Sequence, residues 1–122
     1  MYLFVIQNGM SNDVHMNVFD RALHLASKSS MNQKHGAVIL DKNGGIIGEG
    51  FNHFANFMCH SWSCHAEIAA LLSIKNKKEK LVDATLVVVR LGSDNNPKLS
   101  KPCDKCRKEI NKFGIKRVFY ST

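Results

Sequence analysis

Apolar residues recur along this chain at two spacings, and the spacings predict its secondary structure. Between residues 13 and 29 they recur every three or four positions, which predicts a helix with one buried face. Helical spacing also follows His65, and it follows Cys103 as far as Gly114, a residue suited to the left-handed end of a helix. The pattern therefore predicts helices in the first, middle and last thirds of the chain.

Continuous apolar runs predict buried strands, because a strand covered on both faces has no polar side. These runs span residues 36–40, 46–52, 84–91 and 115–120. Asn43-Gly44 lies between the first two and predicts a tight hairpin. A further β-prone run at residues 2–6 is either an edge strand or a packed N-terminal arm.

The predicted order is helix, hairpin, helix, strand, helix, strand. Strand-helix-strand repeats predict parallel pairing with helices on the sheet faces. We therefore expect an α/β fold: a three-layer α/β/α sandwich whose mixed sheet has an antiparallel first hairpin followed by parallel strands. The length of 122 residues suits a single domain over 1–122, with 1–10 as the edge strand or arm.

Composition and charge narrow the class of protein. The 44% apolar and 22% charged residues are ordinary for a globular protein, and the net charge of +7 favours anionic partners or simply reflects solvated lysines. No secretory signal or membrane-spanning run is evident, so we expect a cytoplasmic protein without membrane contact. In a reducing compartment the Cys-x-x-Cys at Cys103 and Cys106 indicates a metal or redox site.

Two motifs carry the candidate chemistry, His65-Ala66-Glu67 and Pro102-Cys103-Asp104-Lys105-Cys106. His65, Cys103 and Cys106 form a three-ligand set for zinc, which leaves a fourth position for water, as in catalytic zinc sites. The combined H-x-E…P-C-x-x-C pattern is the signature of zinc-dependent nucleobase deaminases. Zn²⁺ is therefore the expected cofactor.

Glu67 is not needed as a ligand and is the expected catalytic residue. A zinc-bound water is acidified towards neutral pH, and a carboxylate beside it can move its proton to the substrate. Both motifs lie at predicted helix N-termini, which should favour thiolates at Cys103 and Cys106. The alternatives are a redox cysteine pair, or a structural zinc site closed by a fourth ligand from Cys59, His60 or Cys64.

The sequence resembles the cytidine and deoxycytidylate deaminase superfamily from the first helix onward. Besides the two zinc motifs, the segments similar to that family are His35-Gly36-Ala37-Val38-Ile39, Gly50-Phe51-Asn52 and residues 114–120. A histidine as first ligand is typical of its deoxycytidylate, tRNA-adenosine and polynucleotide-cytosine branches. The resemblance implies a cytidine deaminase-like fold, zinc at the three ligands and Glu67 as proton carrier.

The resemblance also implies substrate contacts. Asn52 would touch the sugar or base, the Ala66 backbone N–H would touch the base, and Asn32 and Lys34 lie where nucleotide-specific members contact sugar or phosphate. The chain departs from the family pattern at His35, where a small aliphatic residue is usual. It also departs at Lys101, where serine or glutamate is commoner.

Three functions follow, from different classes. The first is a zinc-dependent hydrolytic deaminase of a free cytosine nucleotide or nucleoside, deoxycytidylate-like, that yields uracil and ammonia. The second is a polynucleotide deaminase of cytosine or adenine in RNA or single-stranded DNA, which the basic charge favours. The third is a catalytically silent zinc-binding regulatory subunit, which the intact Glu67 disfavours. The resemblance also implies a homo-oligomer.

Overall fold

The computed structural model describes residues 2–6, 16–54, 63–74 and 81–122, and within them a mixed sheet forms the centre of the fold. Its strand order is β1-β8-β6-β2-β3, with a short β7 paired to β6. These strands are β1 (Tyr2–Ile6), β2 (Lys34–Leu40), β3 (Ile46–Phe51), β6 (Thr85–Leu91), β7 (Pro97–Lys98) and β8 (Arg117–Ser121). β2 runs antiparallel to β3 and β6, whereas β6 and β1 run parallel to β8.

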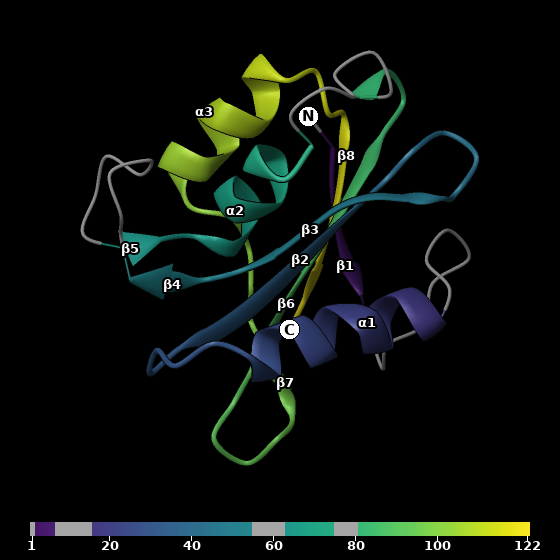
Figure 1. The fold of residues 1–122 in the computed structure, drawn as a ribbon. Coiled ribbons are helices and arrows are strands. Elements are labelled where there is room, and N and C mark those ends of the chain that lie inside the picture. The colour runs from purple at the N-terminus through teal and green to yellow at the C-terminus, as the bar shows by residue number, and fades with distance from the viewer. Residues whose placement is uncertain (1, 7–15, 55–62, 75–80) are drawn as a thin grey trace.

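Helices cover both faces of the sheet (Figure 1). They are α1 (Met16–Ser27), α2 (Ala66–Leu72) and α3 (Asp104–Lys112). α1 packs on the face that carries Val38 and Val87, and α2 and α3 pack on the face that carries Ile39 and Val88. The predicted α/β/α layering and mixed sheet are therefore confirmed. The predicted start of the first helix lies partly outside the described residues.

The N-terminal run of residues 2–6 is an edge strand. β1 pairs in parallel with β8, in a register that joins Tyr2 to Arg117 and Ile6 to Ser121. Phe4 stacks on Phe119 with ring centroids 4.9 Å apart, which anchors β1 by packing as well as by hydrogen bonds. The sequence pattern left this segment open between a strand and an arm, and the structure shows the strand.

The hairpin between β2 and β3 forms as predicted. Gly44 has a φ of +87°, and the Asp41 carboxylate accepts hydrogen bonds from the backbone N–H of Asn43 and of Gly45, both at 2.9 Å. An aspartate that binds the backbone two residues on stabilises such a turn. A register shift between Ile39 and Leu40 marks a bulge near the turn.

Glycines let the helices approach the sheet closely. A Cβ on Gly36 would lie 2.0 Å from the Ala22 carbonyl oxygen of α1, and one on Gly50 would lie 2.5 Å from the Ala70 amide nitrogen of α2. Gly48 and Gly50 lie in β3, the second strand of this hairpin. In the structure they make room for α2, because helix backbone occupies the space that their side chains would fill.

Two stretches that the sequence predicted as irregular contain short strands. β4 (His53–Phe54) pairs antiparallel with β5 (Ser63–Cys64). The loop over residues 92–101 contains β7, which folds back on β6 through a turn in which Gly92 N–H donates to the Asn96 carbonyl at 2.9 Å. A strand of two residues is too short to show an alternating pattern of apolar residues, so the sequence pattern missed both strands.

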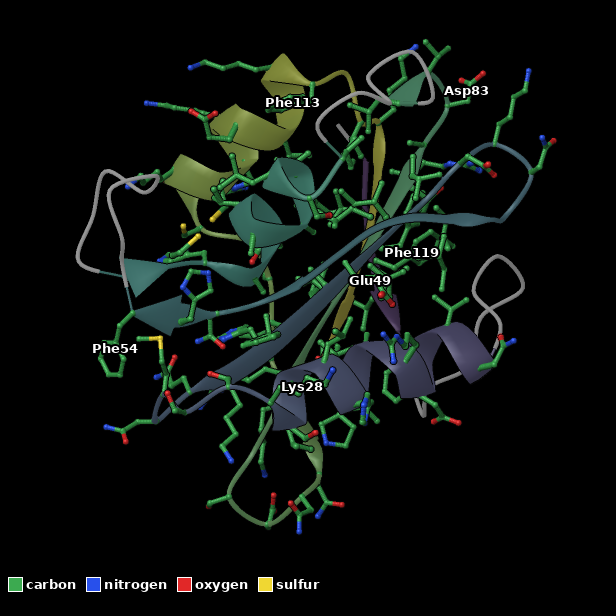
Figure 2. The ribbon with its side chains drawn as sticks, viewed as in Figure 1. Lys28, Glu49, Phe54, Asp83, Phe113 and Phe119 are labelled. Carbon is green, nitrogen blue, oxygen red and sulfur yellow. The ribbon has the colours of Figure 1, made fainter. Side chains whose placement is uncertain are left out.

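A bidentate ion pair joins α1 to β3. Arg21 Nε and Nη2 donate to the two carboxylate oxygens of Glu49 at 2.5 and 3.0 Å, and Glu49 points towards α1 in Figure 2. The hydrogen bond from Arg21 is the main cause that lowers the pKa of Glu49. Among the described helices, none is long and apolar enough to cross a membrane.

Candidate metal centre and substrate cavity

The metal-ligating side chains come from the starts of two helices. His65 is the N-cap of α2, Cys103 is the N-cap of α3, and Cys106 lies in the first turn of α3. The main-sheet strands that precede these helices, β3 and β6, run in the same direction because both are antiparallel to β2, so their carboxyl ends lie at the same end of the sheet. The topology therefore brings together side chains that are about forty residues apart in sequence.

The spacing of these three side chains fits zinc. The Nδ1 atom of His65 lies 3.1 Å from Cys106 Sγ and 3.7 Å from Cys103 Sγ, and all the ligand atoms lie within 4.8 Å of one another. Nitrogen and sulfur ligands of one tetrahedral zinc ion lie about 3.6 Å apart. His65, Cys103 and Cys106 are thus positioned to bind a metal ion. In the described part of the chain, Cys64 is not in this group.

Burial shifts the pKa values of His65 and Cys106 in the metal-free chain. It lowers the pKa of His65, with a smaller contribution from the charge of Lys105, and this favours the neutral imidazole that metals bind. Burial also raises the pKa of the Cys106 thiol, and the charge of Glu67 adds to the effect. Burial therefore opposes the predicted thiolate at Cys106 in the metal-free chain. A bound metal would deprotonate it.

Glu67 lies buried beside the ligands, on the first turn of α2, with 5% of its surface exposed. Burial raises its pKa to about 6. A carboxyl group with a pKa near the working pH can both accept and donate a proton, which is the property that general acid–base catalysis requires. The geometry therefore suits Glu67 to carry protons.

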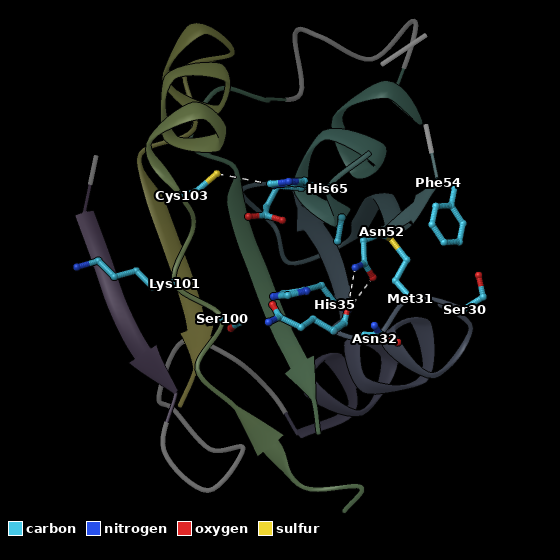
Figure 3. Close-up of a pocket in the computed structure, with 13 residues that line it drawn as sticks. Ser30, Met31, Asn32, His35, Asn52, Phe54, His65, Ser100, Lys101 and Cys103 are labelled. Carbon is cyan, nitrogen blue, oxygen red and sulfur yellow. Dashed lines mark hydrogen bonds between the residues drawn. The ribbon is translucent and has the colours of Figure 1, made fainter. Parts of the chain in front are cut away.

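A cavity of about 460 Å³ opens beside this cluster. Figure 3 shows His65 and Cys103 on one side of it and His35 on the opposite side. Its walls are formed by Ser30, Met31, Asn32, Gln33, His35, Asn52, Phe54, His65, Ala66, Glu67, Ser100, Lys101 and Cys103. This volume lies within the range of roughly 300–1,000 Å³ typical of small-molecule sites.

The structure brings three of the four predicted substrate residues to the cavity. Asn32, Asn52 and Ala66 line it, whereas Lys34 does not. Side chains alternate along a strand, and β2 already includes Lys34, so this side chain belongs to the α1 face while His35 belongs to the cavity face. The apolar run of residues 36–40 begins two residues after the start of β2, so Lys34 fell outside the predicted strand.

The Asn52 side chain joins the ends of β2 and β3. Its Oδ1 accepts from the His35 backbone N–H at 2.8 Å, and its Nδ2 donates to the Gln33 carbonyl at 2.6 Å. An amide group has one further acceptor site and one further donor hydrogen. Asn52 is therefore held rigidly and keeps polar capacity towards the cavity.

Several cavity residues escaped the sequence analysis. Ser30, Met31 and Gln33 directly precede β2, and Ser100 precedes the Pro-Cys motif. Their places next to motif residues were the available signal. Phe54 also lines the cavity and is 59% exposed. Cys59 and His60, two of the possible fourth zinc ligands, lie outside the described residues.

Buried hydroxyl groups fix the segment that leads to Cys103. Ser100 Oγ donates to the Val88 carbonyl at 2.9 Å and accepts from the Ser121 backbone N–H at 2.8 Å. Ser121 Oγ in turn accepts from the Arg90 backbone N–H at 3.0 Å. Because buried polar groups are costly unless they are hydrogen-bonded, these contacts hold the segment against β6 and β8.

Replacing Cys106 by serine should remove most of the bound zinc, because a hydroxyl is a far weaker zinc ligand than a thiolate. Losing a supporting hydrogen bond to a ligand already costs about 10–100-fold in metal affinity, and losing the ligand itself should cost more. Metal analysis of the purified variant measures the effect. Cys64→Ser is the matched control and should keep its zinc, since Cys64 is not in the ligand group. Loss of zinc from Cys64→Ser instead would indicate a closed four-ligand site.

His35 should make the fold sensitive to acid. Burial lowers its pKa from 6.5 to about 4, so the unfolded chain binds this proton at a higher pH than the folded chain. Its contribution to stability is complete above pH 6.5 and is lost as the pH falls towards 4. The loss should reach about 1–3 kcal/mol. Denaturant unfolding at pH 7.5 and at pH 4.5 should show a smaller difference for His35→Phe than for the wild type. An equal difference would contradict the assignment.

Comparison with known proteins identifies a family. Residues 12–122 match the profile of the cytidine and deoxycytidylate deaminase zinc-binding region. No sequence among curated proteins matches the chain.

Solved structures share the fold. The deoxycytidylate deaminase of cyanophage S-TIM5, in complex with dCMP and dUMP, has a TM-score of 0.58 at 22% identity, over 89% of this chain and 85% of that one. A cytidine deaminase mutant from Mycobacterium tuberculosis has a TM-score of 0.58 at 17% identity, over 84% and 80%. A Thermotoga maritima diaminohydroxyphosphoribosylaminopyrimidine deaminase/5-amino-6-(5-phosphoribosylamino)uracil reductase has 33% identity and a TM-score of 0.58, over 84% of this chain and 28% of that one.

Proposed function

We propose that this chain, which belongs to the cytidine and deoxycytidylate deaminase family and is thus a zinc-dependent deaminase, acts on a free cytosine nucleotide or nucleoside. A deoxycytidylate-like molecule is the first candidate. The observation that carries the proposal is the placement of buried Glu67 beside His65, Cys103 and Cys106 at the wall of a cavity. The S-TIM5 enzyme, similar in fold, is described with dCMP and dUMP.

His65, Cys103 and Cys106 would hold the zinc ion, which supplies Lewis acidity and so lowers the pKa of water. Glu67 would take one proton from the attacking water while the water oxygen bonds to the ring carbon that bears the amine. It would deliver this proton to the adjacent ring nitrogen. It would then take the second proton from the new hydroxyl group and pass it to the amine, so that the carbon–nitrogen bond breaks, ammonia leaves and the ring carbonyl forms. Each transfer needs Glu67 within hydrogen-bond reach of the ring, and its place on the cavity wall allows this.

Other polar residues of the cavity wall would orient the substrate. Asn52, with spare hydrogen-bonding capacity, and Asn32 suit the sugar, and the Ala66 N–H at the first turn of α2 suits the base. Lys101 is the candidate cation for a phosphate among the lining residues. We leave Lys34 out of this set, because it does not line the cavity.

A substrate panel tests the proposal. Zinc-loaded protein would be incubated with cytidine, deoxycytidine, CMP, dCMP and adenosine, and ammonia release would be measured, with Glu67→Ala as the inactive control. We expect turnover of at least one free cytosine substrate, with dCMP the best. No turnover of any of them would overturn the proposal.

The net charge of +7 favours a second function, deamination of cytosine or adenine within RNA or single-stranded DNA. Short single strands belong in the same panel. Turnover confined to the strands, with binding that weakens steeply as salt is raised, would replace the first proposal by this one. Weak, salt-insensitive binding of the strands would exclude it.

A further inference from the structure

His35 occupies the cavity wall that faces the metal ligands. Side chains alternate along β2, and His35 shares with Ala37 and Ile39 the sheet face that carries α2 and α3. Figure 3 shows His35 across the cavity from His65. The proposed function assigns no role to this side chain, although it is one of the largest polar groups on the wall.

Backbone hydrogen bonds fix the position of this part of β2 beside the cavity. His35 N–H donates to Asn52 Oδ1 at 2.8 Å, and the His35 carbonyl accepts from the Asn52 N–H at 3.2 Å. The next residue, Gly36, lies directly against the backbone of α1, with no room for even a Cβ. β2 therefore cannot retreat from the cavity at this point, and the imidazole stays on its wall.

The imidazole is also uncharged at neutral pH. Burial is the main cause that lowers its pKa to about 4, and the charges of Arg90 and His65 lower it further. Arg90 stands directly opposite His35 on β6. A neutral imidazole is a flat ring that can stack on a heterocycle, and it adds no positive charge that would oppose protonation of a nearby ring nitrogen.

The geometry of the reaction assigns a position to this flat ring. A nucleophile attacks a planar ring carbon over the face of the ring, not through its edge. If the attacking water lies beside the metal ligands and Glu67, one face of the pyrimidine must turn towards them. The opposite face must then turn towards the opposite wall of the cavity, where His35 lies.

We propose that His35 is a specificity-determining residue whose imidazole stacks on the face of the substrate pyrimidine opposite to the metal centre. The inference rests on the proposed function, since it takes a cytosine ring as the substrate. The stack holds the reacting carbon within reach of Glu67. The flat imidazole favours a planar base over a non-planar one. Stacking of a base on a ring side chain accounts for roughly 5- to 100-fold in binding.

Three substitutions at one position test the stack. His35→Phe keeps a flat ring without nitrogen atoms, His35→Val fills the wall without a flat face, and His35→Gln keeps polar atoms without a ring. Relative to the wild type, kcat/KM on the preferred cytosine substrate should fall roughly 5- to 100-fold in His35→Val and His35→Gln. It should stay within about threefold in His35→Phe. Full activity of His35→Val, or activity kept in His35→Gln but lost in His35→Phe, would overturn the stack.

A binding measurement separates this inference from a folding defect and from the proposed function. Titration calorimetry with the uracil product of that substrate, on variants whose zinc content and Tm match the wild type, should show the same order of affinities. Unchanged product affinity in His35→Val, with an active wild type, would overturn the role of His35 alone. A wild type that neither deaminates nor binds any pyrimidine nucleoside or nucleotide would overturn both.

Discussion

Replacing Glu67 by glutamine should lower kcat by about 10²–10⁴-fold, the usual contribution of a general acid–base group. The amide has almost the shape of the carboxyl group but cannot take a proton from water. Because Glu67 is not a metal ligand in our proposal, zinc binding should persist. Folding should persist too, since glutamine removes a buried group whose ionisation is already disfavoured, as its raised pKa of about 6 indicates.

Steady-state kinetics with parallel zinc analysis measures this effect. Glu109→Gln is the matched control, because Glu109 lies on α3, away from the cavity wall, and pairs only with Lys112 among the described contacts. This control should keep full activity. A Glu67→Gln variant with near-normal kcat would show that another group moves the protons. A variant that had lost its zinc would show that Glu67 supports the metal.

Replacing Gly36 by alanine should destabilise the fold by about 3 kcal/mol, at the upper end of the usual cost of overpacking. The new Cβ would meet the Ala22 carbonyl oxygen at 2.0 Å and the Ala26 amide nitrogen at 2.7 Å. Both are backbone atoms of α1, so no side chain can move aside to relieve the clash. Either α1 must lift from the sheet or β2 must shift towards the cavity.

Denaturant unfolding of the two variants Gly36→Ala and Gly45→Ala checks this prediction. A Cβ on Gly45 would approach only the Asp41 carboxylate, at 3.3 Å, and that side chain can move. Gly45→Ala should therefore change the free energy of unfolding by less than about 1 kcal/mol. Equal stability of the two variants would mean that α1 is not packed on β2 as the structure has it.

The sequence predicted the metal ligands well because their positions depend on local rules. A helix that starts after a loop exposes its first turn, and two motifs at such starts converge when the strands before them share a sheet edge. His65 and Cys103 both stand at such helix starts, and the main-sheet strands β3 and β6 that precede them run in the same direction. The buried strands were predictable from local pattern too. A continuous apolar run such as residues 85–91 is stable mainly as a strand covered on both faces.

The rest of the site depends on long-range packing. Lys34 was misplaced because the predicted strand started two residues too late, so the sheet face of its side chain was not determined. Alternation of side chains along the full strand determines that face. The roles of Gly48 and Gly50 were not visible, because a glycine looks the same whether a ligand or a helix approaches it. The pKa of Cys106 depends on how deeply α3 is buried, which no motif shows.

The buried hydroxyl contacts between Ser100 and Ser121 also offer a way to observe the metal centre without a substrate. The amide protons of Arg90, Ser100 and Ser121 are all hydrogen-bonded within this group, and Ser100 lies three positions before Cys103. Their hydrogen–deuterium exchange reports local opening of the segment that carries the ligand. Slowed exchange of these amides would therefore indicate that the metal centre is held in a fixed position.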